Sequence, residues 1–151
     1  MQKGKEDFHQ IYSQFIRGLT LNEIYINNLS MVFKDTPQLP LPLEVAVDFS
    51  GSKFIVEKSE ETNIISIRME QPYILTAQPE NSDEIVFKLK VKFIVKCTSE
   101  IPPTRKILNA YRSNLVINTW PFFRELAQNI GNRAGLPSLT LPFFKRLPRL
   151  P

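Results

Sequence analysis

The sequence predicts an α+β protein in which helices lie on one side of an antiparallel sheet. Three observations support this class. A stretch with helical apolar spacing opens the chain, stretches of two-residue alternation fill its middle, and two more helical stretches follow. The predicted architecture is a four-stranded antiparallel sheet with two C-terminal helices on one side and an extra N-terminal helix.

The first predicted element is an amphipathic helix over residues 5–17, which Gly18 can end. Its apolar residues recur at helical spacing: Phe8, Ile11, Tyr12, Phe15 and Ile16. A helix face of this kind either docks on the sheet of its own chain or binds a partner, and the spacing is compatible with both.

An extended segment, 19–33, follows this helix directly. Its apolar residues fall into two phases, with Leu21 and Tyr25 in one and Ile24 and Ile26 in the other. The change of phase near Asn22 indicates either a β-bulge or a strand that is buried on both faces.

Three further strands are predicted after a proline-rich connection at 36–42. Residues 43–49 alternate between apolar and polar side chains, and residues 54–56 extend or resume that strand. The next strand, 64–75, contains Pro72, which places its far end at an edge or a bulge.

The last predicted strand, 85–97, alternates most clearly, and one of its faces carries Lys88, Lys90, Lys92 and Lys96. A solvated face that discourages aggregation is the first interpretation of these lysines. A surface that follows phosphate groups is the second. Cys97 lies on the apolar phase, as a small buried residue does.

Two helices are predicted within residues 104–135. Thr104 can cap the first, and Asn118 and Thr119 separate it from the second, whose first turn accommodates Pro121. Gly135 can adopt the left-handed conformation that ends a helix. Residues 136–151 then form an extended apolar and basic tail.

The composition is that of one domain of 151 residues with a genuine core. Apolar residues make up 42% of the chain and aromatic residues 11%, which argues against disorder. No apolar run reaches the roughly eighteen residues that a membrane span needs. The N-terminus lacks the apolar centre of a signal peptide, so we expect a cytoplasmic protein. The net charge of +4 raises the question of an acidic partner.

Motifs of catalysis and metal binding are absent from the sequence. It contains no glycine-rich phosphate loop, no Gly-x-Ser-x-Gly and no His-Glu-x-x-His. The single cysteine, Cys97, excludes an internal disulfide, and the single histidine, His9, excludes a histidine-rich metal site. We therefore expect no enzyme, no cofactor and no metal.

Two stretches near the C-terminus carry a resemblance to a known family. Residues 120–125 read Trp-Pro-Phe-Phe-Arg-Glu, and residues 132–142 read Asn-Arg-Ala-Gly-Leu-Pro-Ser-Leu-Thr-Leu-Pro. Their order and spacing resemble the C-terminal signature of the SecB chaperone family. The resemblance implies one SecB-like domain over residues 1–151, built of a helix at 1–18, a sheet at 19–97, two helices at 104–135 and the tail.

The same resemblance implies a function. SecB-like proteins are ATP-independent holdases that bind non-native polypeptide in apolar grooves. The predicted N-terminal helix resembles the branch encoded with toxin–antitoxin pairs, which implies an antitoxin as a dedicated client. General preprotein export with delivery to SecA is the alternative, although SecB presents an acidic surface to SecA and this chain is basic.

Site residues follow from the apolar content of the two ends and from the family's assembly. The candidate client-binding residues are Phe15, Leu19, Leu21, Tyr25, Phe122, Leu126, Phe143 and Phe144. A homotetramer or dimer is implied, with the first strand and Ile107, Leu108, Tyr111 and Leu115 as interface candidates. Trp120 is either a core residue or part of the groove. A basic nucleic-acid-binding or assembly module that uses the lysines is the alternative of another class.

Overall fold

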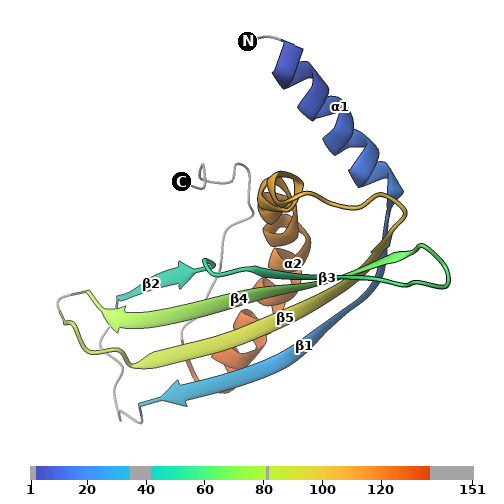
Figure 1. Cartoon of the computed structure of the whole chain (residues 1–151). Helices are drawn as coiled ribbons and strands as arrows, with labels where there is room; N and C mark the ends of the chain where they lie inside the picture. The colour runs from blue at the N-terminus through green and yellow to red at the C-terminus, as the bar shows by residue number, and fades with distance from the viewer. Residues whose placement is uncertain (1–2, 35–41, 81, 137–151) are drawn as a thin grey trace.

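The structure, a computed structural model, describes residues 3–34, 42–80 and 82–136. Within them, an antiparallel five-stranded sheet follows an N-terminal helix and precedes a C-terminal helix in the chain, and both helices lie on one side of it, which confirms the predicted α+β class (Figure 1). The elements in chain order are α1 (Lys3–Gly18), β1 (Leu19–Phe33), β2 (Leu43–Asp48), β3 (Lys53–Lys58), β4 (Ile65–Pro79), β5 (Phe87–Ser99) and α2 (Arg105–Arg133).

The sheet has five strands where four were predicted. Its order is β1-β5-β4-β2, and β3 also pairs with β4. The 15 residues of β4 are enough to pair with β2 at one end and with β3 at the other. Residues 54–56 therefore belong to a separate strand, which resumes the pairing with β4 after the short connection at 49–52.

Pro72 lies inside β4, which continues past it to Pro79, so the predicted strand end at 75 is wrong. On the β2 and β3 side, the pairing leaves residues 71–73 without a strand partner. A proline, which has no N–H to donate, is tolerated where a strand lacks a neighbour. The fully buried Gln71 spans this gap, because its Nε2 donates to the Phe49 carbonyl oxygen at 2.8 Å.

The structure replaces the two predicted C-terminal helices with one, because α2 continues through Thr119 and Pro121. The Thr119 hydroxyl donates to the Leu115 carbonyl oxygen at 2.8 Å, a bond that a residue inside a helix makes. Its position is also held from the sheet, since the Tyr73 hydroxyl lies 2.8 Å from Thr119 Oγ1. The sequence signal for a new helix start is thus overridden by contacts from β4.

Both ends of α2 match the prediction. The Thr104 side chain accepts a hydrogen bond from the Ile107 N–H at 3.3 Å, as an N-cap does. Gly135 has a φ of +73°, and the Leu136 N–H donates to the Gly131 carbonyl oxygen at 3.0 Å. This is the glycine-ended cap in which the residue after the glycine also packs onto the core, and Leu136 is buried.

The core lies between α2 and one face of the sheet. Odd-numbered residues of β4 and β5 point towards α2 and are buried. Tyr73 is at the centre, with its ring stacked on Phe123 at 4.4 Å between centroids and 5.9 Å from Trp120. The even-numbered residues of both strands form the opposite face, which no described helix covers (Figure 1).

The C-terminal half of α1 packs on the first half of α2. Phe15 is fully buried, with its ring edge-on to Tyr111 at 6.1 Å. The Tyr12 hydroxyl accepts a hydrogen bond from Asn114 Nδ2 at 2.8 Å. The helix therefore docks within its own chain, although its first half extends away from the sheet (Figure 1). Within the described residues, neither helix has the length and apolar character to cross a membrane.

Burial of ionisable groups between α2 and the sheet predicts loss of stability at high pH. Burial raises the pKa of the Cys97 thiol from 9.0 to about 11. The pKa of Tyr111 is raised from 10.0 to about 12, mainly by burial and to a lesser extent by the nearby Cys97 and Tyr12 groups. Both groups lose a proton earlier in the unfolded chain than in the folded one. Their contribution to the free energy of unfolding is therefore fully present below about pH 9 and is lost as the pH rises towards 12.

Urea unfolding at a series of pH values checks this. The free energy of unfolding should fall steadily above about pH 9, and Cys97→Ala should remove part of that slope between the two pKa values of the thiol. An unchanged slope in Cys97→Ala would show that the thiol is not shielded as the structure indicates.

Candidate functional site

The apolar residues of β1 share one face of the sheet because the strand has two irregularities. Its register with β5 shifts between Leu21 and Glu23 and again between Ile26 and Asn28. Each bulge changes the alternation by one residue. The apolar residues of β1 consequently pair with the buried residues of β5, and they are Leu21, Ile24, Ile26, Leu29, Met31 and Phe33. The bulge predicted near Asn22 is confirmed, and the second was not predicted.

This apolar row, here called the β1 strip, is only partly covered by the rest of the chain. The strand is an edge strand, while α2 packs chiefly over β4 and β5. Leu21 is 53% exposed, and Ile26, Leu29 and Met31 are also exposed. Within the described residues, the outer side of β1 has no strand partner, and a long apolar edge of this kind is a surface on which another chain can associate.

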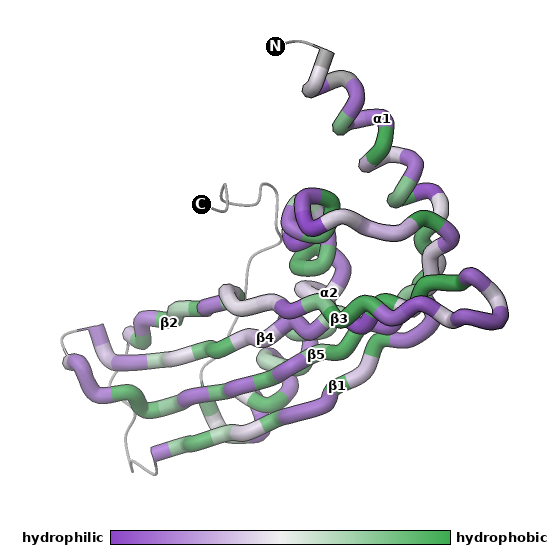
Figure 2. Tube along the Cα trace, viewed as in Figure 1, coloured by the Kyte–Doolittle hydropathy of each residue, from purple (hydrophilic) through white to green (hydrophobic). Residues whose placement is uncertain are grey.

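A groove lies between the β1 strip and the second half of α2. It has a volume of 370 Å³ and is lined by Ile24, Tyr25, Ile26, Phe93, Phe122, Glu125, Leu126 and Asn129. Its walls are mainly apolar, with two polar residues contributed by α2. Figure 2 shows the apolar stretches of β1 beside those of the central strands. A hollow of this kind can bury apolar side chains of another polypeptide.

Two neighbouring aromatic residues of α2 have different environments. Trp120 is 6% exposed and belongs to the core cluster around Tyr73, whereas Phe122 is 48% exposed and lines the groove. Residues two positions apart on a helix point in different directions, so the Trp120 side chain packs on the sheet while the Phe122 side chain stays accessible. Trp120 is therefore a core residue.

The predicted client-binding residues do not all come together. Tyr25, Phe122 and Leu126 line the groove, and Leu21 lies further along the β1 strip. The Tyr25 hydroxyl, however, accepts a hydrogen bond from Arg68 Nη1 at 3.3 Å on the opposite face of the sheet. Phe15 is fully buried and Leu19 half-buried in the cluster between α1, α2 and the sheet. Phe143 and Phe144 lie outside the described residues.

Several groove residues were missed by the sequence analysis. Ile24, Ile26 and Phe93 line the groove, and Leu29 and Met31 extend the β1 strip. The available signal was the change of phase in β1. Counting a bulge at Asn22 moves Ile24 and Ile26 onto the face of Leu21. A second change of phase, from Ile24 and Ile26 to Leu29 and Met31, marks the second bulge at residue 27.

The interface candidates on α2 lie mainly within the chain's own core. Ile107, Tyr111 and Leu115 are buried against β4, β5 and α1, and Leu108 is half-buried. A second subunit that contacts α2 would have to use its other side, where Ile117 is exposed.

The side chains that line the groove are mainly apolar. Within the described residues, no cluster of His, Cys, Asp and Glu could hold a metal ion. Cys97 is buried on the α2 side, and the raised pKa of its thiol makes it a poor nucleophile. Apolar surface from three elements, β1, β5 and α2, converges at the groove.

Comparison with known proteins shows the fold. Neither a protein-family model nor a curated protein matches the sequence. Among solved structures, a SecB-like chaperone from Mycobacterium tuberculosis, in complex with a ChAD peptide from the HigA1 antitoxin, superimposes with a TM-score of 0.69. The match covers 91% of this chain and 99% of the other, at 18% identity. A protein of unknown function from Streptococcus agalactiae matches with a TM-score of 0.47, at 12% identity, over 83% of this chain and 97% of its own.

The chain therefore has the fold of a SecB-like chaperone, and the predicted resemblance is confirmed at the level of the fold.

Trp120 and Phe122 provide a matched pair of substitutions. We expect Trp120→Ala to lower the free energy of unfolding by roughly 3–5 kcal/mol, because it leaves a cavity beside Tyr73. Phe122→Ala should cost less, about 1 kcal/mol, because its ring already lies half in solvent. Chemical denaturation of both variants measures the difference, and equal losses would contradict the assignment of one ring to the core and the other to the groove.

Proposed function

We propose that this protein is an ATP-independent chaperone that binds non-native polypeptide in the groove between β1 and α2. The observation that carries the proposal is the apolar groove, continued by the exposed β1 strip, on the fold of a SecB-like chaperone. An antitoxin is the client that we favour, because the solved chaperone of this fold was bound to an antitoxin peptide.

The binding mechanism is burial of alternate side chains. A polypeptide in an extended conformation points every second side chain to the same side. Laid along β1, it can place those side chains on Leu21, Ile26 and Met31, and into the groove beside Phe122. The rings and branched side chains recognise apolar character rather than one sequence, which suits a client that has not folded.

The energy source of this mechanism is apolar burial alone. Each large apolar side chain removed from water contributes about 1.5–3 kcal/mol, so a few such contacts hold a segment reversibly. The sequence has no glycine-rich phosphate loop for a nucleotide. Holding an unfolded segment away from solvent would protect it from aggregation until it folds or is transferred, and neither step requires a reaction by the chaperone.

General preprotein export is the second candidate function, since the same groove could serve it. The described face opposite α2 carries Lys88, Lys90 and Lys96 from β5 and Arg68 from β4. The central β5 row of this face is basic, and a basic row does not support transfer to SecA through an acidic surface, so we favour the dedicated client.

We also propose that the chain assembles into a dimer or tetramer through the outer edge of β1. The groove between strand and helix would stay open to the client, while the unpaired N–H and C=O groups of the edge would meet those of a second copy. An exposed apolar edge strand on a monomer invites uncontrolled association, and a defined partner removes that hazard.

Client binding can be tested with an unfolded protein or a candidate antitoxin peptide in a calorimeter. Phe122→Ser should weaken binding by roughly tenfold or more, because one large apolar contact is lost. Ile117→Ser is the matched control, since Ile117 lies on the same helix, is exposed to nearly the same extent at 47%, and does not line the groove.

Binding should show a negative heat-capacity change and weak dependence on salt, as apolar burial does. The double change Lys88→Gln with Lys90→Gln should leave client binding nearly unchanged. Affinity that collapses on addition of salt and survives Phe122→Ser would mean that the lysines, and not the groove, bind the client.

Assembly can be tested by light scattering. We expect a dimer or tetramer at micromolar concentration, and we expect Met31→Lys to shift it towards monomer by placing charge on the β1 strip. Val45→Lys is the control, because Val45 is an exposed apolar residue on the opposite edge of the sheet. A wild-type monomer at that concentration would refute the proposed assembly.

A further inference from the structure

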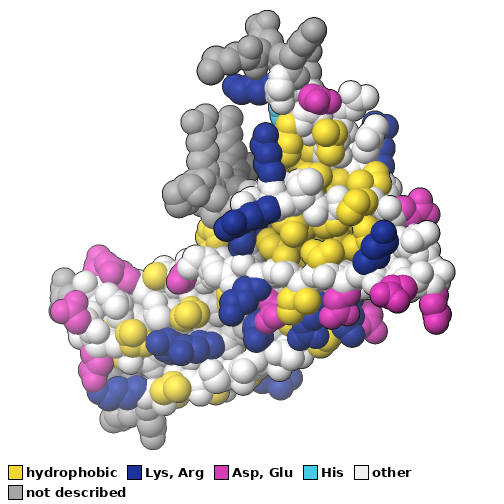
Figure 3. Space-filling model, in the orientation of Figure 1, with side chains coloured by type: hydrophobic (Ala, Val, Ile, Leu, Met, Phe, Trp, Pro, Cys, Tyr) yellow, Lys and Arg dark blue, Asp and Glu magenta, His cyan; other side chains and the backbone are white. Residues whose placement is uncertain are grey.

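The face of the sheet opposite α2, here called the open face, carries a basic row along β5, while Glu44 and Asp48 of β2 and Glu57 of β3 lie on the same face nearer its other edge. Lys88, Lys90, Lys92 and Lys96 alternate along β5, and Arg68 lies beside them on β4. Figure 3 shows lysine and arginine side chains spread over this face of the sheet. Because alternate residues of a strand lie about 6.8 Å apart, the four lysines extend over about 27 Å.

These lysines do not protect a sheet edge. Charged residues on an edge strand discourage pairing with another chain, but β5 is a central strand between β1 and β4. The protective interpretation of the lysine row therefore does not apply. The exposed edge strand β1 instead carries the apolar residues of the β1 strip.

Several of the cations lack an opposite charge. Glu70 pairs with Lys92 at 3.1 Å and Glu23 pairs with Lys96 at 3.4 Å. Lys88, Lys90 and Arg68 have no carboxylate partner within the described residues. Arg68 also lies directly opposite Lys96 in the pairing of β4 with β5, and like charges in that position repel each other. A ligand that brings carboxylates would relieve this repulsion.

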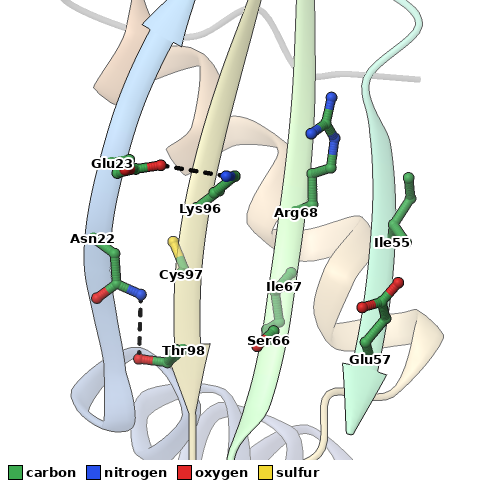
Figure 4. A pocket seen from close by; sticks show the side chains of 10 residues that line it. All are labelled: Asn22, Glu23, Ile55, Glu57, Ser66, Ile67, Arg68, Lys96, Cys97 and Thr98. Atoms are coloured by element: carbon green, nitrogen blue, oxygen red, sulfur yellow. Dashed lines mark hydrogen bonds and ion pairs between the residues drawn. The ribbon is translucent and has the colours of Figure 1, made fainter. Parts of the chain in front are cut away.

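The shape of the open face suits a chain rather than a small ion. A pocket of 610 Å³ surrounds Arg68 and Lys96, with polar groups of Asn22 and Thr98 beside them (Figure 4). Its lining also includes Glu23 and Glu57, so the pocket is not a concentrated positive site for a free anion. Further along the face, Lys88 and Lys90 lie between Val32 on β1, which is 67% exposed, and Ile74 on β4.

We propose that the open face is a docking surface for an acidic segment of a partner polypeptide, extended along β5. Its carboxylates would meet Lys88, Lys90 and Arg68, and the side chains between them would contact apolar residues such as Val32 and Ile74. A segment of about eight residues spans the lysine row. This surface is separate from the groove, so the proposal goes beyond the proposed function and does not depend on it.

A polypeptide fits the open face better than a nucleic acid does. Sites for single-stranded nucleic acids combine a basic groove with aromatic rings on which bases stack. Among the described residues of this face, Tyr25 is the one aromatic, and it is engaged by Arg68 and by Lys96, whose Nζ lies 5.3 Å from the ring centroid. Glu23 and Glu70 would also repel a continuous row of phosphates, whereas a peptide can space its carboxylates to avoid them.

The test is fluorescence anisotropy with a labelled peptide of about ten residues that alternates glutamate and valine, matched to the repeat of the lysines. Wild-type protein should bind it, and a peptide alternating glutamine and valine should not bind. Lys88→Gln with Lys90→Gln should weaken binding by about fivefold to tenfold, as expected for two exposed charge contacts. Added salt should weaken it further.

The control with the same net charge is Lys5→Gln with Lys58→Gln, because both lysines are exposed and lie away from the open face. It should retain binding, as should Phe122→Ser. An equal loss of peptide affinity in the control would show that net charge alone causes the effect, and it would overturn the proposal. Loss only in Phe122→Ser would place the peptide in the groove instead.

Tighter binding of oligothymidylate of equal length, abolished by the same lysine changes, would make the face a nucleic-acid site and would likewise overturn the proposal. Lys90→Gln alone provides a milder variant whose folding can be verified by its unfolding curve. Client binding is measured separately, with an unfolded client and the groove variants.

Discussion

The contact between Tyr73 and the middle of α2 is the constraint on which the rest of the structure depends. Its ring stacks on Phe123, and its hydroxyl lies within hydrogen-bonding distance of Thr119. The hydroxyl is fully buried, and its pKa is raised because burial disfavours the charged form. A polar group this deep in the core must be satisfied, so the sheet and the helix can meet in only one register. That register sets which residues are core and which line the groove.

The groove is a consequence of where α2 docks. The helix covers β4 and β5, and the apolar residues of β1 extend beyond its reach. In a protein without a partner, such a row would be a hazard, because the described chain covers it only in part. A client segment over the strip and a second subunit at the edge offer complementary ways to cover it.

The two faces of the sheet separate two kinds of chemistry. Facing α2, the β1 strip and Phe122 can bury apolar side chains of many sequences. On the open face, the lysines of β5 and Arg68 favour carboxylates and depend on salt. Because the side chains of a strand alternate, neighbouring residues such as Phe93 and Lys92 serve different faces. The two surfaces that we propose would therefore use different side chains of the same strands.

The sequence by itself determined the features that depend on neighbours in the chain. Alternation identified β5, helical spacing identified α1, and Thr104 and Gly135 marked the ends of α2. The motif at the C-terminus pointed to the fold that the structure shows. Only the tertiary structure decided that Thr119 lies inside one long helix, that β3 is separate from β2, and that Trp120 is buried while Phe122 is open. In each of these cases the deciding partner, such as Tyr73 or β4, is distant in sequence. Local spacing carries no information about which of two apolar residues such a partner will cover.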